Sequence, residues 1–138
     1  MADLILMLDV ETELDALYDT EPETAALFDV LFDELVYNKE VLDVLCNPGH
    51  RHLFDPPFEI KRFEEMWRKG YNIYTMRVYD EQGALLPRRV LIGYHAQADI
   101  YYPLAFPQRE FAYETSDPSF SIVVHRYAEA GIPAYVYR

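Results

Sequence analysis

Three runs of sequence decide the fold: NIYTMRVY (72–79), RRVLIGY (88–94) and IYYPLAF (100–106). Each run is rich in isoleucine, valine and tyrosine, the residue types that favour strands. Polar turns separate them at residues 80–83 and 96–99, which predicts successive antiparallel strands. Pro103 lies inside the third run, so we expect an edge, a bulge or a break in register there.

The residues before these strands predict helices. Thr20-Glu21-Pro22-Glu23 is typical of a helix start, because Thr20 can cap a helix and proline is tolerated in a first turn. The segment that follows carries a broad apolar face at helical spacing, formed by Leu27, Phe28, Val30, Leu31, Phe32, Leu35 and Val36. Residues 11–18 are weakly helical, residues 39–46 predict a shorter helix, and the apolar run 4–8 favours a short strand.

The segments around the strands complete the expected architecture. Residues 49–57 predict a loop and residues 58–69 a helix with Ile60, Phe63 and Trp67 on one face. Residues 119–130 predict a closing helix that Gly131 ends, and residues 134–137 a last short strand. Helices first and strands afterwards indicate a single α+β domain over 1–138, in which a helical N-terminal third packs on an antiparallel sheet of three to five strands.

The charge is unevenly placed along the chain. Residues 1–47 hold thirteen acidic side chains and a single base, Lys39, so this third carries the whole net charge of −12. A polyanion would be repelled by this third and tolerated only locally by the rest. An acidic helical surface that simply faces water is the competing explanation of the acidic residues in this third.

Composition favours a cytosolic protein. No stretch reaches the roughly 18 consecutive apolar residues that a membrane helix needs, so we expect no membrane partner. The opening residues lack the basic segment of a secretory signal, and Cys46 is the single cysteine. His50 and His52 alternate within the expected loop, but no spaced His or Cys pattern accompanies them. We therefore expect neither a metal site nor a cofactor.

Arginines and tyrosines gather near the ends of the expected strands, which points to phosphate chemistry. They are Arg77, Arg88, Arg89, Arg109 and Tyr113. Guanidinium groups bind phosphate and stabilise charge that develops on it. A tyrosine hydroxyl can hydrogen-bond an attacking 2′-oxygen, and its ring can stack on a base. Such residues are also ordinary at strand ends, so a structural role is the competing interpretation.

In order and spacing, residues 58–130 resemble the core of the RelE/ParE toxin superfamily. The resemblance rests on the three runs quoted above, followed by Arg109 and then Tyr113. It implies a RelE-like fold and a toxin of a toxin–antitoxin system, an endoribonuclease of the mRNA interferase type that cleaves RNA, often on the ribosome, without a metal. An antitoxin protein would be a partner.

The resemblance also implies roles for individual residues. Arg77 matches a position that binds RNA phosphate in active members. Arg88, which opens the second strand, is expected to be a further substrate-binding residue. Arg89 matches the arginine at the scissile phosphate, Arg109 the one that stabilises the transition state, and Tyr113 the tyrosine that orients or deprotonates the 2′-hydroxyl. The first strand has Thr75 and Met76 where active members often carry lysines. The alternative is a non-catalytic relative whose acidic N-terminal helices engage a protein partner, or cover the arginines.

Alternation along the strands predicts how these residues meet. Arg77 and Arg89 share a face if the intervening turn pairs their strands. We then expect a basic groove with Gly93 as its floor and Tyr113 as its wall. In the competing arrangement the arginines form surface ion pairs with Glu110, Glu114 and the N-terminal carboxylates.

Overall fold

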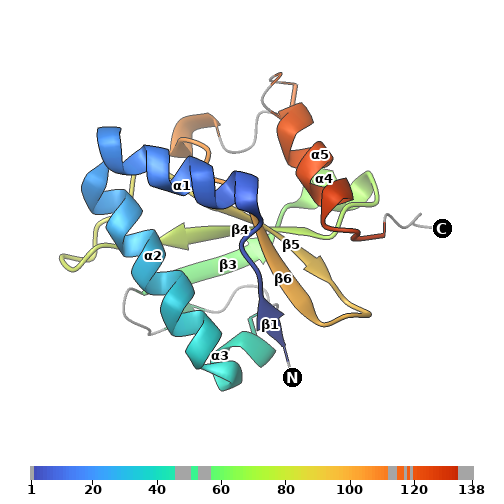
Figure 1. Ribbon diagram of the computed structural model, residues 1–138, viewed down its shortest axis with the longest axis horizontal. Helices are drawn as coiled ribbons and strands as arrows, with labels where there is room; N and C mark the ends of the chain where they lie inside the picture. The colour runs from blue at the N-terminus through green and yellow to red at the C-terminus, as the bar shows by residue number, and fades with distance from the viewer. Residues whose placement is uncertain are drawn as a thin grey trace.

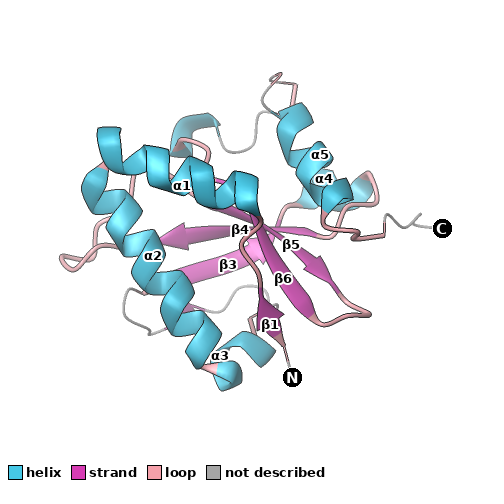
Figure 2. Cartoon of the chain, viewed as in Figure 1, coloured by secondary structure: helices cyan, strands magenta, loops and turns pink. Residues whose placement is uncertain are grey.

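The computed structural model describes residues 2–45, 51–52, 57–111, 115–116, 118 and 120–133, with the backbone alone at 51, 52 and 111. Six strands form one mixed sheet in the order β1-β6-β5-β4-β3-β2. Figures 1 and 2 label five of them, β1 and β3 to β6, together with the helices around the sheet. The strands are β1 (Asp3–Leu4), β2 (Arg51–His52), β3 (Phe58–Arg62), β4 (Ile73–Val78), β5 (Val90–His95) and β6 (Ile100–Ala105). The helices are α1 (Leu8–Thr20), α2 (Pro22–Tyr37), α3 (Lys39–Asp43), α4 (Glu64–Arg68) and α5 (Phe120–Glu129), with a 3-10 turn at Arg109–Phe111.

The α+β class is confirmed, and so are the three strands on which the prediction was built. β4, β5 and β6 pair antiparallel, and Gly83, with φ +80°, allows the turn between β4 and β5. The sheet differs from the prediction in having β1 parallel to β6 and β2 and β3 as further strands. The expected disturbance at Pro103 is confirmed, because the β5–β6 register shifts between Leu91 and Ile92, where Ile92 lies opposite Pro103.

Helices α1, α2 and α3 cover one face of the sheet, which we call the N-terminal face (Figure 1). The prediction of a strong apolar side on α2 is confirmed, although the buried residues are Ala25, Phe28, Leu31, Phe32 and Leu35. Val30 is 47% exposed and lies off this side. Phe28 and Phe32 pack on Phe106, which joins the helices to the sheet. The strands contribute these even-numbered residues of β3, β4 and β5: Phe58, Ile60, Tyr74, Met76, Val78, Val90 and Ile92.

The opposite face, which we call the C-terminal face, packs partly against α5. Ile73, Leu91 and Leu104 meet Phe120, Val123, Tyr127 and Ile132 there, together with Phe63 and Met66. The closing helix is therefore confirmed. The Tyr127 hydroxyl accepts a hydrogen bond from the Asn72 amide at 3.0 Å and donates one to the Pro133 carbonyl at 3.1 Å, and burial raises its pKa.

Two helix predictions are wrong, each for a local reason. Residues 58–69 were expected to be one helix, but Phe58–Arg62 is a strand and only Glu64–Arg68 is helical. Phe58 and Ile60 alternate inward and pair with Val78 and Met76, and this pairing outweighs the apolar spacing that suggested a helix. Thr20 is not a helix cap, because it is the last residue of α1. The predicted helix start itself is confirmed, since α2 begins at Pro22 with Glu21 before it.

The remaining predictions fall near the limits of the described chain. The expected loop at 49–57 contains β2, whose backbone pairs with β3. Cys46, His50 and the predicted strand at 134–137 lie outside the described residues, as does the side chain of His52. No helix in the described part of the chain is long and apolar enough to cross a membrane.

Candidate functional site

The C-terminal face has a polar half beyond the residues that pack on α5. Neighbouring strands place Glu59 and Lys61 (β3), Thr75 and Arg77 (β4) and Arg89 (just before β5) on this half. Arg109, the first residue of the 3-10 turn that follows β6, lies there as well. We call this set of residues the basic patch. Its four cations and one carboxylate contrast with the net charge of −12 of the whole chain.

Strand register puts Arg77 and Arg89 on one face. Met76 lies opposite Val90, and both are buried against the N-terminal helices. Arg77 and Arg89 are the next residues along the two strands, so their side chains leave from the other face. Arg89 is only 8% exposed, while Arg77 is half-buried. Two guanidinium groups on adjacent strands repel each other, and an anion between them relieves that repulsion.

Arg109 reaches the same face through the extension of β5 and β6. Leu91 pairs with Ala105, the Arg89 amide donates to the Pro107 carbonyl at 3.0 Å, and the Arg109 amide donates to the Pro87 carbonyl at 2.8 Å. Arg89 and Arg109 then line one open cavity of about 540 Å³, together with Leu85, Pro87 and Glu110. Arg109 is exposed, and it forms no ion pair with a described carboxylate, so the expected pair with Glu110 is not formed.

Arg88 belongs to a different part of the molecule, and the expectation that it binds substrate is not supported by its position. Its Nε donates to the Glu21 carboxylate at 2.6 Å, and its Nη1 donates to the Phe106 carbonyl at 2.7 Å. The ion pair to Glu21 is the surface pairing expected as the competing arrangement. Arg88 thus ties the start of α2 to the end of β6.

Gly93 is not the floor of the basic groove, which corrects that prediction. A Cβ atom at this position would lie 2.8 Å from Ile132 Cδ1 and 3.2 Å from Leu104 Cδ1. Gly93 therefore sits under the residues that follow α5, in the half of the face that is already packed. The predicted wall, Tyr113, and the predicted partner Glu114 lie outside the described residues.

A second cavity of the basic patch was missed at the sequence level. It measures about 90 Å³ and is lined by Glu59, Ile60, Lys61, Thr75 and Arg77. The alternation of β4 would have placed Thr75 beside Arg77. Glu59 could not have been found, because residues 58–62 were expected to be helical rather than paired with β4.

The N-terminal helices do not cover the basic patch, because they pack on the other face. Among the described residues no group of three His, Cys, Asp or Glu side chains is arranged to hold a metal ion. The described side chains of the patch can supply hydrogen bonds and positive charge.

No protein-family model matches the chain, and no curated protein or solved structure is significantly similar to it.

Proposed function

We propose that the basic patch binds the phosphodiester backbone of RNA, and that the chain is a RelE-like toxin that cleaves RNA, including mRNA on the ribosome. One observation carries the proposal: three adjacent strands bring Arg77, Arg89 and Arg109 to one face, and two of these arginines line one cavity. Guanidinium groups bind phosphate through paired hydrogen bonds. Phosphate binding requires these arginines to converge on one face. Arginines that each form a separate surface ion pair have no need to do so.

The proposed reaction needs no metal. The 2′-oxygen forms a bond to the adjacent phosphorus while the bond from phosphorus to the 5′-oxygen breaks, which leaves a 2′,3′-cyclic phosphate and a 5′-hydroxyl. Arg89 and Arg109 offset the negative charge that builds on the phosphate oxygens. Tyr113 is assigned the orientation or deprotonation of the 2′-hydroxyl, and the departing 5′-oxygen takes a proton from water.

The proposal is tested by incubating the purified chain with programmed ribosomes and with free RNA, and by analysing the ends of the products. We expect 2′,3′-cyclic phosphate ends, and an Arg109→Ala rate at least about a hundredfold lower, as for the loss of one transition-state donor. Arg68→Ala is the matched control, since Arg68 is exposed on α4, near the Ile73 end of β4 and away from Arg77. The absence of cleavage with ribosomes present, or equal rates for both variants, would exclude this function.

A non-catalytic binding protein is the second candidate, and the outer surface of α2 favours it. Val30 is 47% exposed and Tyr37 is 87% exposed, on a helix whose solvent side also carries Asp33 and Glu34. Apolar side chains among carboxylates suit a basic protein segment, such as that of an antitoxin. For this candidate, Tyr37→Ser should weaken binding to a co-expressed antitoxin, and the wild-type chain should neither bind nor cleave RNA.

A further inference from the structure

The smaller cavity of the basic patch holds two buried polar atoms that have no hydrogen-bond partner. Thr75 is fully buried, and its Oγ1 has no partner among the described residues. The Nε of Arg77 is also buried and also without a partner there. Both residues line the cavity of about 90 Å³. Buried polar atoms are nearly always paired in folded proteins, so two of them at one cavity indicate that a ligand supplies the missing partner.

The charges around this cavity restrict the chemistry of that ligand. Glu59 lies directly opposite Arg77 in the β3–β4 register, yet the two side chains form no ion pair. A group bound between them can accept a hydrogen bond from the Arg77 Nε and donate one to the Glu59 carboxylate. Lys61 also lines the cavity, but a phosphate only accepts hydrogen bonds, and it would face the Glu59 carboxylate. A hydroxyl both donates and accepts, and it therefore fits both sides of the cavity.

The size of the cavity points to the same group. A volume of about 90 Å³ is well below the roughly 300 Å³ at which pockets for drug-sized ligands begin. It exceeds the roughly 30 Å³ share of one water molecule. A hydroxyl with the ring carbons next to it is of this size, whereas a complete nucleotide is not.

We propose that the Glu59–Thr75–Arg77 cavity binds a ribose hydroxyl of the RNA strand whose phosphate lies at Arg89 and Arg109. Arg77 is on the strand next to Arg89, so neighbouring parts of one nucleotide chain reach both cavities. The 2′-hydroxyl is the group by which a protein distinguishes RNA from DNA. The cavity therefore selects RNA. This inference rests on the proposed RNA-binding function.

The test compares the binding of single-stranded RNA and DNA of the same sequence at low temperature, with the RNA checked to be intact. We expect the wild-type chain to bind RNA about tenfold more tightly, the preference that one or two hydrogen bonds provide. Thr75→Val replaces the hydroxyl by a methyl group of similar shape, and it should lower the RNA affinity toward that for DNA while the DNA affinity stays constant. Thr75→Ser should keep the preference. Arg109→Ala should weaken the binding of both strands by the same factor.

The outcomes separate the two proposals. If the wild-type chain binds both strands equally, or if folded Thr75→Val prefers RNA as strongly as the wild-type chain, the hydroxyl site is overturned and phosphate binding stands. If the wild-type chain binds neither strand, the proposed function fails and the hydroxyl site fails with it. If Thr75→Val does not fold, Arg77→Met decides, because loss of the Nε donor must lower the RNA-to-DNA ratio as well as overall affinity.

Discussion

Gly93 shows how a single missing side chain sets the distance between sheet and covering segment. Ile132 and Leu104 fill the space where a Cβ atom would stand, and Tyr127 Cδ2 would lie 3.4 Å from that atom. The chain after α5 can then pack directly on β5, which holds α5 over its half of the C-terminal face. The basic patch remains outside this packed half. Glycine at 93 therefore has a structural role beside the site rather than a role in it.

A double-mutant cycle tests this role. Gly93→Ala should lower the free energy of unfolding by about 1 kcal/mol, because the new methyl group overpacks against Ile132 Cδ1. Ile132→Val removes that same Cδ1 atom and should cost about 1 kcal/mol alone. The double variant should be no less stable than Ile132→Val, a favourable coupling measurable by urea unfolding. Strictly additive costs would show that Gly93 and Ile132 are not in contact.

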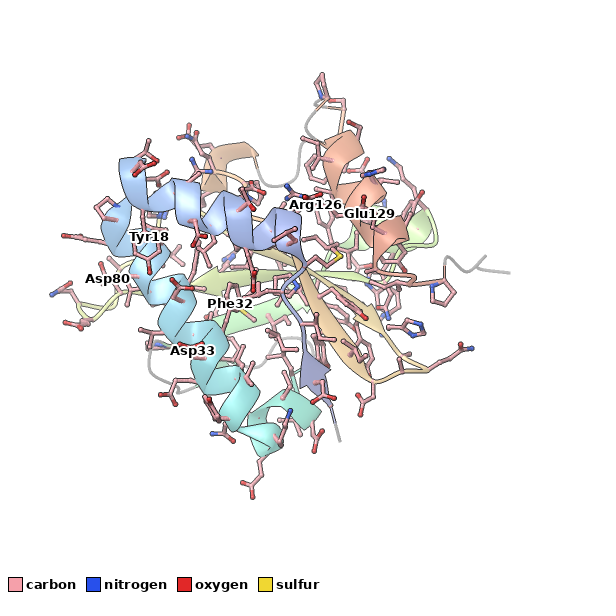
Figure 3. All side chains as sticks on the ribbon, viewed as in Figure 1. Tyr18, Phe32, Asp33, Asp80, Arg126 and Glu129 are labelled. Carbon is pink, nitrogen blue, oxygen red and sulfur yellow. The ribbon has the colours of Figure 1, made fainter. Side chains whose placement is uncertain are left out.

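Strand β6 is protected along its outer edge by two arginines from different elements. Beyond the two residues that pair with β1, the Leu104 carbonyl accepts from Arg126 at 2.7 Å and the Phe106 carbonyl accepts from Arg88 at 2.7 Å. Each arginine also forms an ion pair with a carboxylate from the α1–α2 segment: Arg126 pairs with Glu13 of α1, and Arg88 pairs with Glu21, which lies between α1 and α2. Figure 3 shows Arg126 between α5 and α1. An edge strand left open invites pairing with other chains, and these contacts close it.

This arrangement predicts opposite effects for two arginines of the same region. Arg88→Gln should lower the free energy of unfolding by about 1–3 kcal/mol, since Glu21 loses its cationic partner and the Phe106 carbonyl loses the Nη1 donor. The RNA affinity of the folded fraction should not change. Arg109→Gln should leave the stability within about 0.5 kcal/mol, as for an exposed residue, and should weaken RNA binding. If the Arg88→Gln variant folded well but bound RNA more weakly, Arg88 would have to contact RNA.

The strands could be predicted from the sequence because their signal is local. β4, β5 and β6 each combine β-prone residues with a polar turn. Pro103 predicted the shift in register between β5 and β6. β3 could not be predicted in this way. Its two inward residues, Phe58 and Ile60, fit a helix as well as a strand, and only pairing with β4 decides between them.

In the candidate site, too, local sequence patterns predicted some features, whereas contacts between distant residues could not be predicted. Alternation within β4 and β5 was enough to place Arg77 and Arg89 on one face. The partner of Arg88 could not be predicted, because Glu21 is 67 residues away in sequence and on another element. Gly93 was misplaced because the sequence does not show which half of a face a helix will cover.

At the scale of the whole molecule, the sheet separates the two kinds of charge. The acidic helices α1 and α2 pack on the N-terminal face, and the basic patch lies on the C-terminal face. A helix on a sheet adds a layer of roughly 10 Å, so the outer carboxylates lie farther than this from the arginines. The Debye length is about 8 Å at physiological ionic strength and about 30 Å at 0.01 M. An anionic ligand therefore experiences the acidic helices at low salt and hardly at all at physiological salt.

Neutralising part of the helical charge tests this separation. Asp15, Asp19 and Asp33 are exposed on α1 and α2, and their replacement by asparagine removes three negative charges far from the patch. RNA should bind the triple variant more tightly than the wild-type chain at 0.01 M salt, because long-range repulsion falls, and equally tightly at 0.15 M. Fluorescence anisotropy across a salt series measures both affinities. If the gain in affinity persisted at 0.15 M salt, RNA would pass close to the helices, and its path could not be confined to the C-terminal face.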